Sequence, residues 1–559
     1  MGRTENNSAT YLATGNPCLD FFFHVVPDTP ASELVSRLVL AWDHDALTAL
    51  KLICNLRGVR GTGKSEKEGF YTAALWLHEN HPKTLACNMK AIAEFGYFKD
   101  MLEILYRLLE GAEIRKSEKA EWDEIKEAKH GFKRKFKVNK ETARSTRLQK
   151  TVSKARKALE RYNRDPDYRL LHDCVSDVFA ELLRADMEFY NAGELYKIGL
   201  ASKWCPTLDS SYDKSTLMCE SVARKVFPRE EFAEYQDVEE AHYAYRVRER
   251  LRKEVLVPLH KALELPEVYI CANKWDQLPY KRVASVSMKT YKKLFYKHDK
   301  ERFEEYLDKV KSGKSTIAAG ALLPHEIIRS LGDGTGPEVA ELQWKRMVDD
   351  LAKKGKLRNC MAICDVSASM TGTPMEVSVA LGLLISELSE EPWKGKLITF
   401  STSPEFHEIG GDSLLSKTSF IRMMDWDGNT DFQKVFDRIL EVAVRGSLGE
   451  EQMIKTLFVF SDMEFDQAST SRSWETDYQV ILRKFRKKGF QKVPQIVFWN
   501  LRNSKATPVP STQEGVALLS GFSKNLVTLF LEVDGILNPD AVMQQAISGE
   551  EYQKLVVID

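Results

Sequence analysis

The 559-residue chain lacks several features that would assign it to a special class of protein. It has no net charge, because 81 Lys and Arg residues balance 81 Asp and Glu residues, so its overall charge favours no partner. No apolar run approaches the roughly 18 residues of a membrane-spanning helix. The nine cysteines form no C-x-x-C pair, and no basic, then apolar, leader pattern opens the chain. We therefore expect a cytoplasmic or nuclear protein with reduced thiols and no membrane partner.

The length predicts several domains, because a chain of this size exceeds what one hydrophobic core accommodates. From Ala31 to about residue 350, apolar residues such as Leu34, Leu38 and Trp42 recur at helical spacing. We predict a flexible N-terminus over residues 1–10 and an α-helical, solenoid-like module over residues 11–335. The Gly-rich run from Ser330 to Pro337 predicts a linker over residues 336–355.

The pattern changes after residue 356. Short apolar runs typical of strands alternate with amphipathic runs typical of helices. The predicted strands are Cys360–Cys364, Leu397–Phe400, Thr456–Phe460, Gln495–Trp499 and Leu526–Leu531, and the predicted helices are Met375–Leu388, Phe432–Val444 and Asp477–Lys488. This alternation predicts an α/β, Rossmann-like domain with a mostly parallel sheet over residues 356–559.

Side chains that carry oxygen follow two of the predicted strands. Asp365, Ser367 and Ser369 come just after the first strand, Asp462 follows the third, and Thr430 lies in a loop between them. Binding sites in such sheets lie beyond the carboxyl ends of strands. Oxygen donors are the ligands that Mg²⁺ or Mn²⁺ prefers, so the pattern predicts one divalent-cation site. The alternative is that these residues only cap helices.

This set of residues resembles the metal-ion-dependent adhesion site (MIDAS) of von Willebrand factor A (vWA) domains. The resemblance implies that the hydroxyls of Ser367, Ser369 and Thr430 bind the ion directly, while Asp365 and Asp462 act largely through water. It also implies an open position on the ion that accepts a carboxylate from a protein partner.

A second motif indicates a different function. Gly58–Ser65 matches the phosphate-binding pattern G-x-x-x-x-G-K-S, with Gly63, Lys64 and Ser65 as candidate nucleotide-binding residues, and Asn273–Asp276 matches the guanine-reading pattern N-K-x-D. Such a loop needs a strand before it, whereas Asp45–Arg57 has the spacing of a helix. The sequence therefore favours a Gly-rich basic turn between two helices, although a GTPase, or a turn that contacts RNA phosphates, stays open.

Basic residues are concentrated in two stretches. Residues 115–164 contain 18 Lys and Arg residues against 7 Asp and Glu residues, and residues 281–314 contain 11 against 5. The first stretch includes the candidate RNA-binding residues Phe132, Lys133, Arg134, Lys135, Phe136 and Lys137. Basic side chains attract phosphate and aromatic rings stack on bases. The alternative is a solvated helical surface with ion pairs between successive turns.

The whole chain resembles the plant and large-virus domain-of-unknown-function family 2828. The resemblance rests on Gly15–Phe23, Arg57–Lys64, Ser202–Pro206, Ser285–Lys289 and Cys364–Ser369. A helical module followed by a vWA-like domain is also similar to the Ro ribonucleoprotein (TROVE) family, which implies RNA as a partner. With no catalytic constellation evident, we expect a non-enzymatic interaction protein with a MIDAS-type cation. A Ro-like RNA-binding scaffold and a P-loop GTPase are the alternatives.

Overall fold

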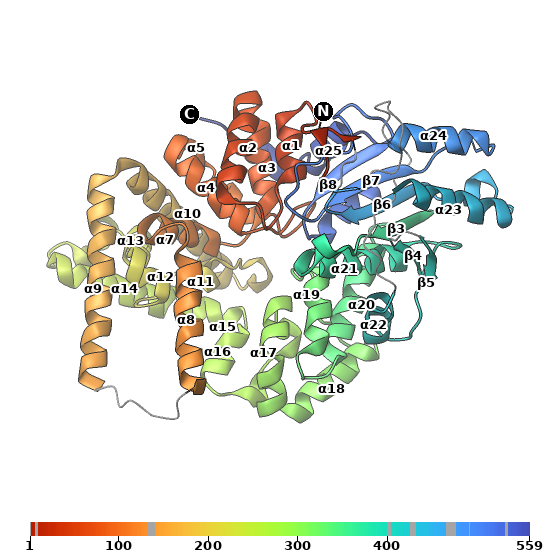
Figure 1. The fold of residues 1–559 in the computed structure, drawn as a ribbon. Helices are drawn as coiled ribbons and strands as arrows, with labels where there is room; N and C mark the ends of the chain where they lie inside the picture. The colour runs from red at the N-terminus through yellow and green to blue at the C-terminus, as the bar shows by residue number, and fades with distance from the viewer. Residues whose placement is uncertain are drawn as a thin grey trace. The chain divides into compact units, whose positions relative to one another are not determined.

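The chain forms two compact units. The structure, a computed structural model, describes residues 2–5, 9–131, 140–399, 404–424, 432–465, 477–490, 492–531 and 535–559. Unit 1 comprises Met1–Phe70 and Asn273–Gln553, and unit 2 comprises Tyr71–Ala272 and Lys554–Asp559. Figure 1 shows that the large sheet belongs to unit 1, while the described part of unit 2 is drawn as helices and loops.

The sheet of unit 1 has six strands in the order β5-β4-β3-β6-β7-β8. Their bounds are β3 (Cys360–Cys364), β4 (Lys396–Thr399), β5 (Phe406–Glu408), β6 (Thr456–Ser461), β7 (Gln495–Asn500) and β8 (Val516–Ser520). Neighbouring strands are parallel except β5, which runs antiparallel to β4. Chain order reverses between β3 and β6, and this is where open parallel sheets bind ligands.

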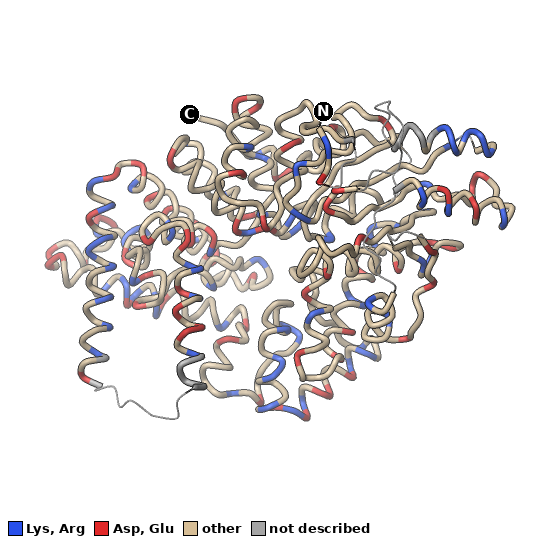
Figure 2. The backbone as a smooth tube through the Cα atoms, in the orientation of Figure 1, with Lys and Arg blue, Asp and Glu red and all other residues tan. Residues whose placement is uncertain are grey.

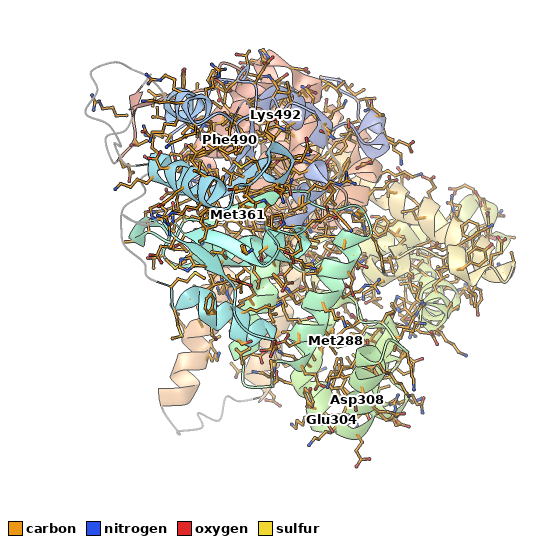
Figure 3. The ribbon with its side chains drawn as sticks, turned by 90° about the vertical axis from the view of Figure 1, so that its right-hand side faces the viewer. Met288, Glu304, Asp308, Met361, Phe490 and Lys492 are labelled. Carbon is orange, nitrogen blue, oxygen red and sulfur yellow. The ribbon has the colours of Figure 1, made fainter. Side chains whose placement is uncertain are left out.

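Helices pack closely on this sheet. Helix α21 (Thr373–Leu388) lies against β3, and a Cβ atom at Gly382 would sit 2.1 Å from the sulfur of Cys364, so glycine permits the close approach. Helix α25 (Pro539–Ala546) packs on β8. The other helices of this region are α22 (Leu414–Arg422), α23 (Phe432–Arg445) and α24 (Asp477–Lys487). Met361, labelled in Figure 3, is fully buried, as expected for a strand covered on both faces.

The N-terminal segment also belongs to unit 1. Three of its helices, α1 (Pro17–His24), α2 (Ala31–His44) and α3 (Ala46–Arg57), pack on one another, and α1 contacts β8. Within the predicted N-terminal segment 1–10, β1 (Gly2–Arg3) pairs with β2 (Ala9–Thr10), and Tyr11 bridges to Thr507, while residues 1 and 6–8 lie outside the described residues. Thr4 also donates a hydrogen bond to the carbonyl of Phe465 in the same unit.

Four further helices of unit 1 precede the sheet: α17 (Ser285–His298), α18 (Lys300–Lys311), α19 (Pro324–Arg329) and α20 (Glu338–Ala352). The predicted linker over residues 336–355 is therefore mostly helix α20. The apolar residues Val339, Leu342, Met347 and Leu351 are buried along it, which explains why this segment folds as a helix. Figure 3 shows Glu304 and Asp308 on α18, where both are exposed.

The described residues of unit 2 form helices and the loops that connect them. Its helices are α4 (Glu68–Asn80, which starts in unit 1), α5 (Pro82–Cys87), α6 (Met89–Phe95), α7 (Lys99–Glu110), α8 (Ile114–Gly131), α9 (Lys140–Arg164), α10 (Pro166–Asn191), α11 (Ala201–Trp204), α12 (Ser211–Thr216), α13 (Met218–Val226), α14 (Glu240–Arg250), α15 (Val257–Ala262) and α16 (Pro266–Cys271). The predicted helical N-terminal region and mostly parallel C-terminal sheet are thus confirmed. Within the described ranges, no helix is long and apolar enough to cross a membrane.

Two details of the predicted sheet are wrong. The run Leu526–Leu531 was predicted as a strand but lies mostly in the 3₁₀ helix η10 (Lys524–Phe530), while β8 was not predicted. A short apolar run fits a buried strand or a buried helix equally well, and this explains why the helical run was predicted as a strand. Strand β5 was also missed, because three residues give too short a pattern. The helices predicted after β3, before β6 and before β7 are confirmed as α21, α23 and α24.

Candidate metal and partner-binding site

The carboxylates of Asp365 and Asp462 lie at the point where strand order reverses. Asp365 directly follows β3, and its amide donates a 2.9 Å hydrogen bond to the carbonyl of Phe460 in β6. Asp462 directly follows β6. The two side chains are only 1% and 3% exposed. The fold therefore gathers two buried acidic groups at one edge of the sheet.

Hydrogen bonds fix the orientation of the Asp365 carboxylate. The hydroxyl of Ser461, the last residue of β6, donates a 2.6 Å bond to Oδ2. The amide of Ser367 donates a 2.9 Å bond to Oδ1. These bonds to β6 and to the loop after β3 hold the carboxylate in one position.

Burial keeps the pKa of Asp365 high. The pKa rises to about 6, first because the side chain is removed from water and second because the negative charge of Asp462 is close. The hydrogen bonds from Ser461 and Ser367 oppose this rise. A divalent cation beside the two carboxylates would offset both the repulsion and the lost hydration.

Two hydroxyls lie in the loop that follows Asp365. The Oγ atoms of Ser367 and Ser369 are 2.9 Å apart. Ser367 is half-buried and Ser369 is exposed, in a loop that turns through the short 3₁₀ helix η8 (Ala368–Met370). Neutral hydroxyls near solvent, together with the buried carboxylates, form an oxygen-only donor set that suits Mg²⁺ or Mn²⁺.

The other predicted site residues lie outside the described residues. These are Thr430 of the metal set and Phe132, Lys133, Arg134, Lys135, Phe136 and Lys137 of the RNA set. Across the described ranges, no group of three or more His, Cys, Asp or Glu side chains is placed to hold a metal ion. A cation at this edge would therefore depend on hydroxyl oxygens as well as on Asp365 and Asp462.

Three residues near the site were not predicted. Ser461 orients Asp365, and Arg502, which follows β7, donates a hydrogen bond to the carbonyl of Ser369. Glu464 accepts bonds from the amide of Glu5 at 2.6 Å and from the hydroxyl of Ser504 at 2.8 Å. Burial raises the pKa of Glu464. The only signal in the sequence was that Ser461 ends β6 and that Glu464 and Arg502 lie a few residues past the ends of β6 and β7.

The G-x-x-x-x-G-K-S motif forms a closed structural turn. It follows helix α3, as predicted, and Lys64 is only 2% exposed. The ammonium group of Lys64 donates to the carbonyl of Phe22 and, at 2.7 Å, to the hydroxyl of Ser520. A Cβ atom at Gly63 would sit 2.1 Å from the carbonyl oxygen of Gly58. The lysine points into the protein, whereas a phosphate-binding lysine must face its ligand.

Neighbouring structure also accounts for the other two sequence signals. The N-K-x-D segment follows helix α16, whereas the guanine-reading motif follows a strand. In the basic stretch at 281–314, many side chains form ion pairs. The pairs join Lys289 to Glu326, Lys292 to Asp333, Arg302 to Asp299, Lys309 to Glu305 and Lys311 to Glu338. These ion pairs neutralise part of the stretch, and Lys293, Lys297 and Lys314 remain exposed.

Comparisons with known proteins cover nearly the whole chain. Residues 4–357 match "Domain of unknown function (DUF2828)" and residues 359–556 match "Domain of unknown function (DUF7788)". "Uncharacterized protein L728" of Acanthamoeba polyphaga mimivirus is 26% identical over 555 residues, which is 95% of this chain and 84% of that protein. The crystal structure of Deinococcus radiodurans RO (RSR) protein aligns with a TM-score of 0.37 and 14% identity, over 92% of this chain and 99% of that chain, a likeness too distant to support an argument. The DUF2828 match covers residues 4–357, which is more than half of the 559 residues, so this chain belongs to the DUF2828 family.

Proposed function

We propose that this chain is a non-enzymatic interaction protein that captures a protein partner through a divalent cation. One observation carries the proposal: Asp365 and Asp462 are both buried at the strand-order reversal and close enough to repel each other, and the hydroxyls of Ser367 and Ser369 meet in the loop that follows β3. Repulsion between two buried carboxylates favours a cation at this edge.

The residues present fit Mg²⁺ or Mn²⁺. Ser367, Ser369 and Thr430 would hold the ion through their hydroxyls, and Asp365 and Asp462 would balance its charge. When bound, the ion supplies a coordination position for an acidic side chain of the partner, because Mg²⁺ in proteins keeps several exchangeable positions. Ser461 and the Ser367 amide keep Asp365 oriented toward this edge.

Partner capture by the full-length protein tests the proposal. The immobilised chain is exposed to lysate with Mg²⁺ or with chelator, each with and without RNase, and bound proteins are identified. We expect a set of proteins that needs Mg²⁺ and is lost in the double variant Ser367→Ala/Ser369→Ala. Thr371→Ala is the matched control, since its hydroxyl donates to the Ala368 carbonyl in the same loop. Capture that is equal with chelator, or equal in the double variant, would contradict the proposal.

A second candidate function is RNA binding by unit 2, and helix α9 favours it. The helix carries nine Lys and Arg residues against two Glu residues, and Figure 2 shows the blue positions recurring along it. At 3.6 residues per turn, all of these bases except Arg156 fall on one side of the helix. Such a stripe suits a phosphate backbone.

Three unpaired bases of α9 lie at the end that is nearest in sequence to the predicted RNA residues, while Arg156 and Arg164 farther along the helix are also exposed without a described partner. The side chains of Arg144, Arg147 and Lys150 are exposed and form no hydrogen bond or ion pair with any other residue that the structure describes. Farther along, Lys157 pairs with Glu110 and Arg161 with Asp165. The predicted RNA set at 132–137 would extend this free basic end.

A further inference from the structure

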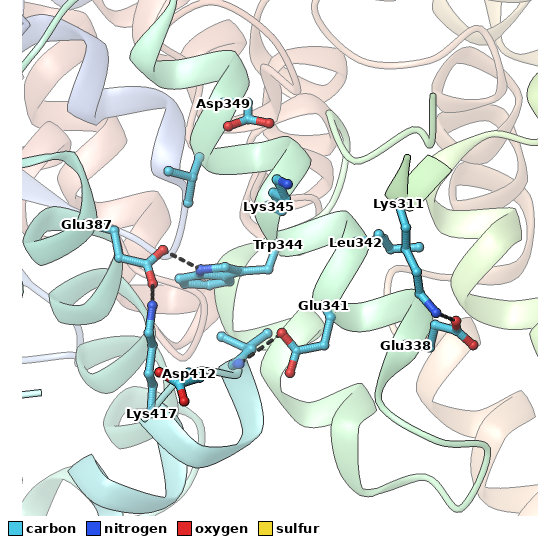
Figure 4. A pocket seen from close by; sticks show the side chains of 12 residues that line it. Lys311, Glu338, Glu341, Leu342, Trp344, Lys345, Asp349, Glu387, Asp412 and Lys417 are labelled. Carbon is cyan, nitrogen blue, oxygen red and sulfur yellow. Dashed lines mark hydrogen bonds and ion pairs between the residues drawn. The ribbon is translucent and has the colours of Figure 1, made fainter. Parts of the chain in front are cut away.

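A cavity of about 510 Å³ in unit 1 lies between helices α18, α20, α21 and α22, away from the sheet edge (Figure 4). One face of α20 forms its main wall, because Glu338, Glu341, Leu342, Lys345 and Asp349 recur at helical spacing. Its size lies within the range of pockets that bind small molecules. The remaining walls come from the end of α18, from α21 and from the start of α22.

Part of the lining is already neutralised within the protein. Lys311 forms an ion pair with Glu338, and Lys417 pairs with Glu387 at 2.6 Å. Glu387 also accepts a 2.8 Å hydrogen bond from the indole nitrogen of Trp344. Figure 4 shows these two paired groups on opposite sides of the cavity. Neither lysine is therefore free to bind an anionic ligand.

The charges that remain are mainly negative. The lining contains five carboxylates and three ammonium groups, and two of each are joined in the two ion pairs. The carboxylates without an ion pair are Glu341, Asp349 and Asp412, and the lysine without one is Lys345. The side chains of Asp349 and Asp412 form no hydrogen bond or ion pair with any other described residue. Glu341 accepts bonds from the amides of Leu414 and Leu415 at 2.9 and 3.2 Å, so it is held in place, and it forms no ion pair with a described residue.

Apolar side chains lie between these carboxylates. Trp344 is 4% exposed, Leu414 is 3% exposed and Leu342 is 9% exposed, and Val348 completes the apolar wall. A ligand that fits must therefore combine positive charge with a hydrocarbon stem. Phosphate-bearing ligands are disfavoured, because the lining carries excess negative charge and Lys345 alone among its lysines has no ion pair with a described residue.

We propose that this cavity binds an alkylammonium group, in which an aliphatic stem lies against Trp344, Leu342 and Leu414 while an ammonium meets Glu341 and Asp412 at one end of the cavity or Asp349 at the other. The group comes either from a free polyamine or from a lysine side chain of a partner peptide. The proposal does not depend on the cation site at the sheet edge, which uses different residues.

Calorimetry on the full-length chain at about 150 mM salt tests this, because that ionic strength screens attraction to scattered surface charges. The probes are spermidine, an acetylated and amidated Ala-Lys-Ala peptide, and 1,6-hexanediol as an uncharged analogue. We expect saturable binding of at least one amine, no binding of the diol, and affinity at least about tenfold lower in Asp349→Asn/Asp412→Asn. Binding of spermidine alone identifies a free amine as the source, and binding of the peptide alone identifies a side chain.

The matched control is Asp43→Asn/Glu405→Gln, which removes two exposed negative charges of unit 1 outside the cavity lining. It should bind the amines like the wild type. The proposal is overturned if neither amine binds the wild type at concentrations up to about 10 mM. Equal amine affinity in the wild type and in Asp349→Asn/Asp412→Asn, or a matching loss in the control, overturns it as well.

Discussion

Lys64 and Ser520 are 456 positions apart in the chain, yet the ammonium group of Lys64 donates a 2.7 Å hydrogen bond to the hydroxyl of Ser520. The same ammonium bonds the carbonyl of Phe22, and the Ser520 hydroxyl also donates to that carbonyl at 2.7 Å. The Gly-rich loop thus ties helix α1 to the last strand of the sheet. A motif that resembles a nucleotide-binding loop serves here as an internal connection.

Replacing this lysine should lower stability and leave nucleotide binding unchanged. Lys64→Ala removes a buried stem that packs on the Phe22 ring, with Nζ 4.3 Å from its centroid, and leaves Ser520 without its donor. We expect a loss of about 2–4 kcal/mol, seen as a lower thermal midpoint. Lys64→Met, which keeps the volume, should lose less. Micromolar binding of fluorescent GTP or ATP that disappears in Lys64→Ala at unchanged thermal midpoint would contradict this account.

His24 should make stability depend on pH. Its pKa is lowered to about 3, mainly by burial and also by the charges of Arg37 and Lys64, against the opposing bond to Ser504 and charge of Glu33. The folded protein therefore keeps His24 neutral, whereas the unfolded chain binds a proton near pH 6.5. Neutral His24 therefore contributes fully to the free energy of unfolding above about pH 6.5. The contribution declines as the pH falls toward 3, by up to about 1.4 kcal/mol per pH unit.

Unfolding by urea between pH 7 and pH 4 measures the effect of His24. His24→Gln should unfold with a shallower pH dependence than the wild type, because glutamine binds no proton in either state. His44→Gln, at an exposed position, should keep the wild-type slope. An identical slope in His24→Gln and wild type would show that the imidazole does not stay neutral in the fold.

The free bases of α9 should contribute to RNA affinity through charge. Replacing Arg144, Arg147 and Lys150 by Gln should weaken RNA retention on filters and flatten its salt dependence, by roughly 0.7–0.9 in log–log slope for each phosphate that is no longer neutralised. The control replaces three exposed lysines of unit 1, Lys293, Lys297 and Lys314. Equal losses in both variants, or no RNA retained at about 50 mM salt, would count against a site on α9.

Local patterns predicted most of the sheet and the places of Asp365 and Asp462 after two of its strands, while long-range contacts escaped prediction. Asp365 and Asp462 could be identified because each directly follows an apolar strand, and parallel strands align their carboxyl ends. The bond from Ser461 to Asp365 and the approach of Arg502 to Ser369 depend on strand register, which a single sequence does not specify. The motif of Lys64 was placed correctly after a helix, but its partner Ser520 could not be predicted.

The division of the chain was harder to predict than its elements. Helix α2 is amphipathic and helices α1 and α3 are buried along nearly their whole length, yet nothing local shows that they pack on the sheet unit and not on the helices of unit 2. They join the sheet through individual polar contacts, such as His24 with Thr507 at 3.0 Å and Asn500 with the carbonyl of Phe23 at 3.2 Å. Likewise, the Gly-rich run before Glu338 indicated a linker, although buried apolar residues continue as α20.

The most direct test of the central claim is a count of Mn²⁺ ions bound by the full-length chain, followed by electron paramagnetic resonance. We predict one Mn²⁺ per wild-type chain, displaced by Mg²⁺, with affinity at least about tenfold lower in Ser367→Ala/Ser369→Ala. These serines are not in the core, so the variant should keep its fold, and Thr371→Ala should bind like the wild type. Equal Mn²⁺ affinity in the wild type and the double serine variant would contradict a cation site at the ends of β3 and β6.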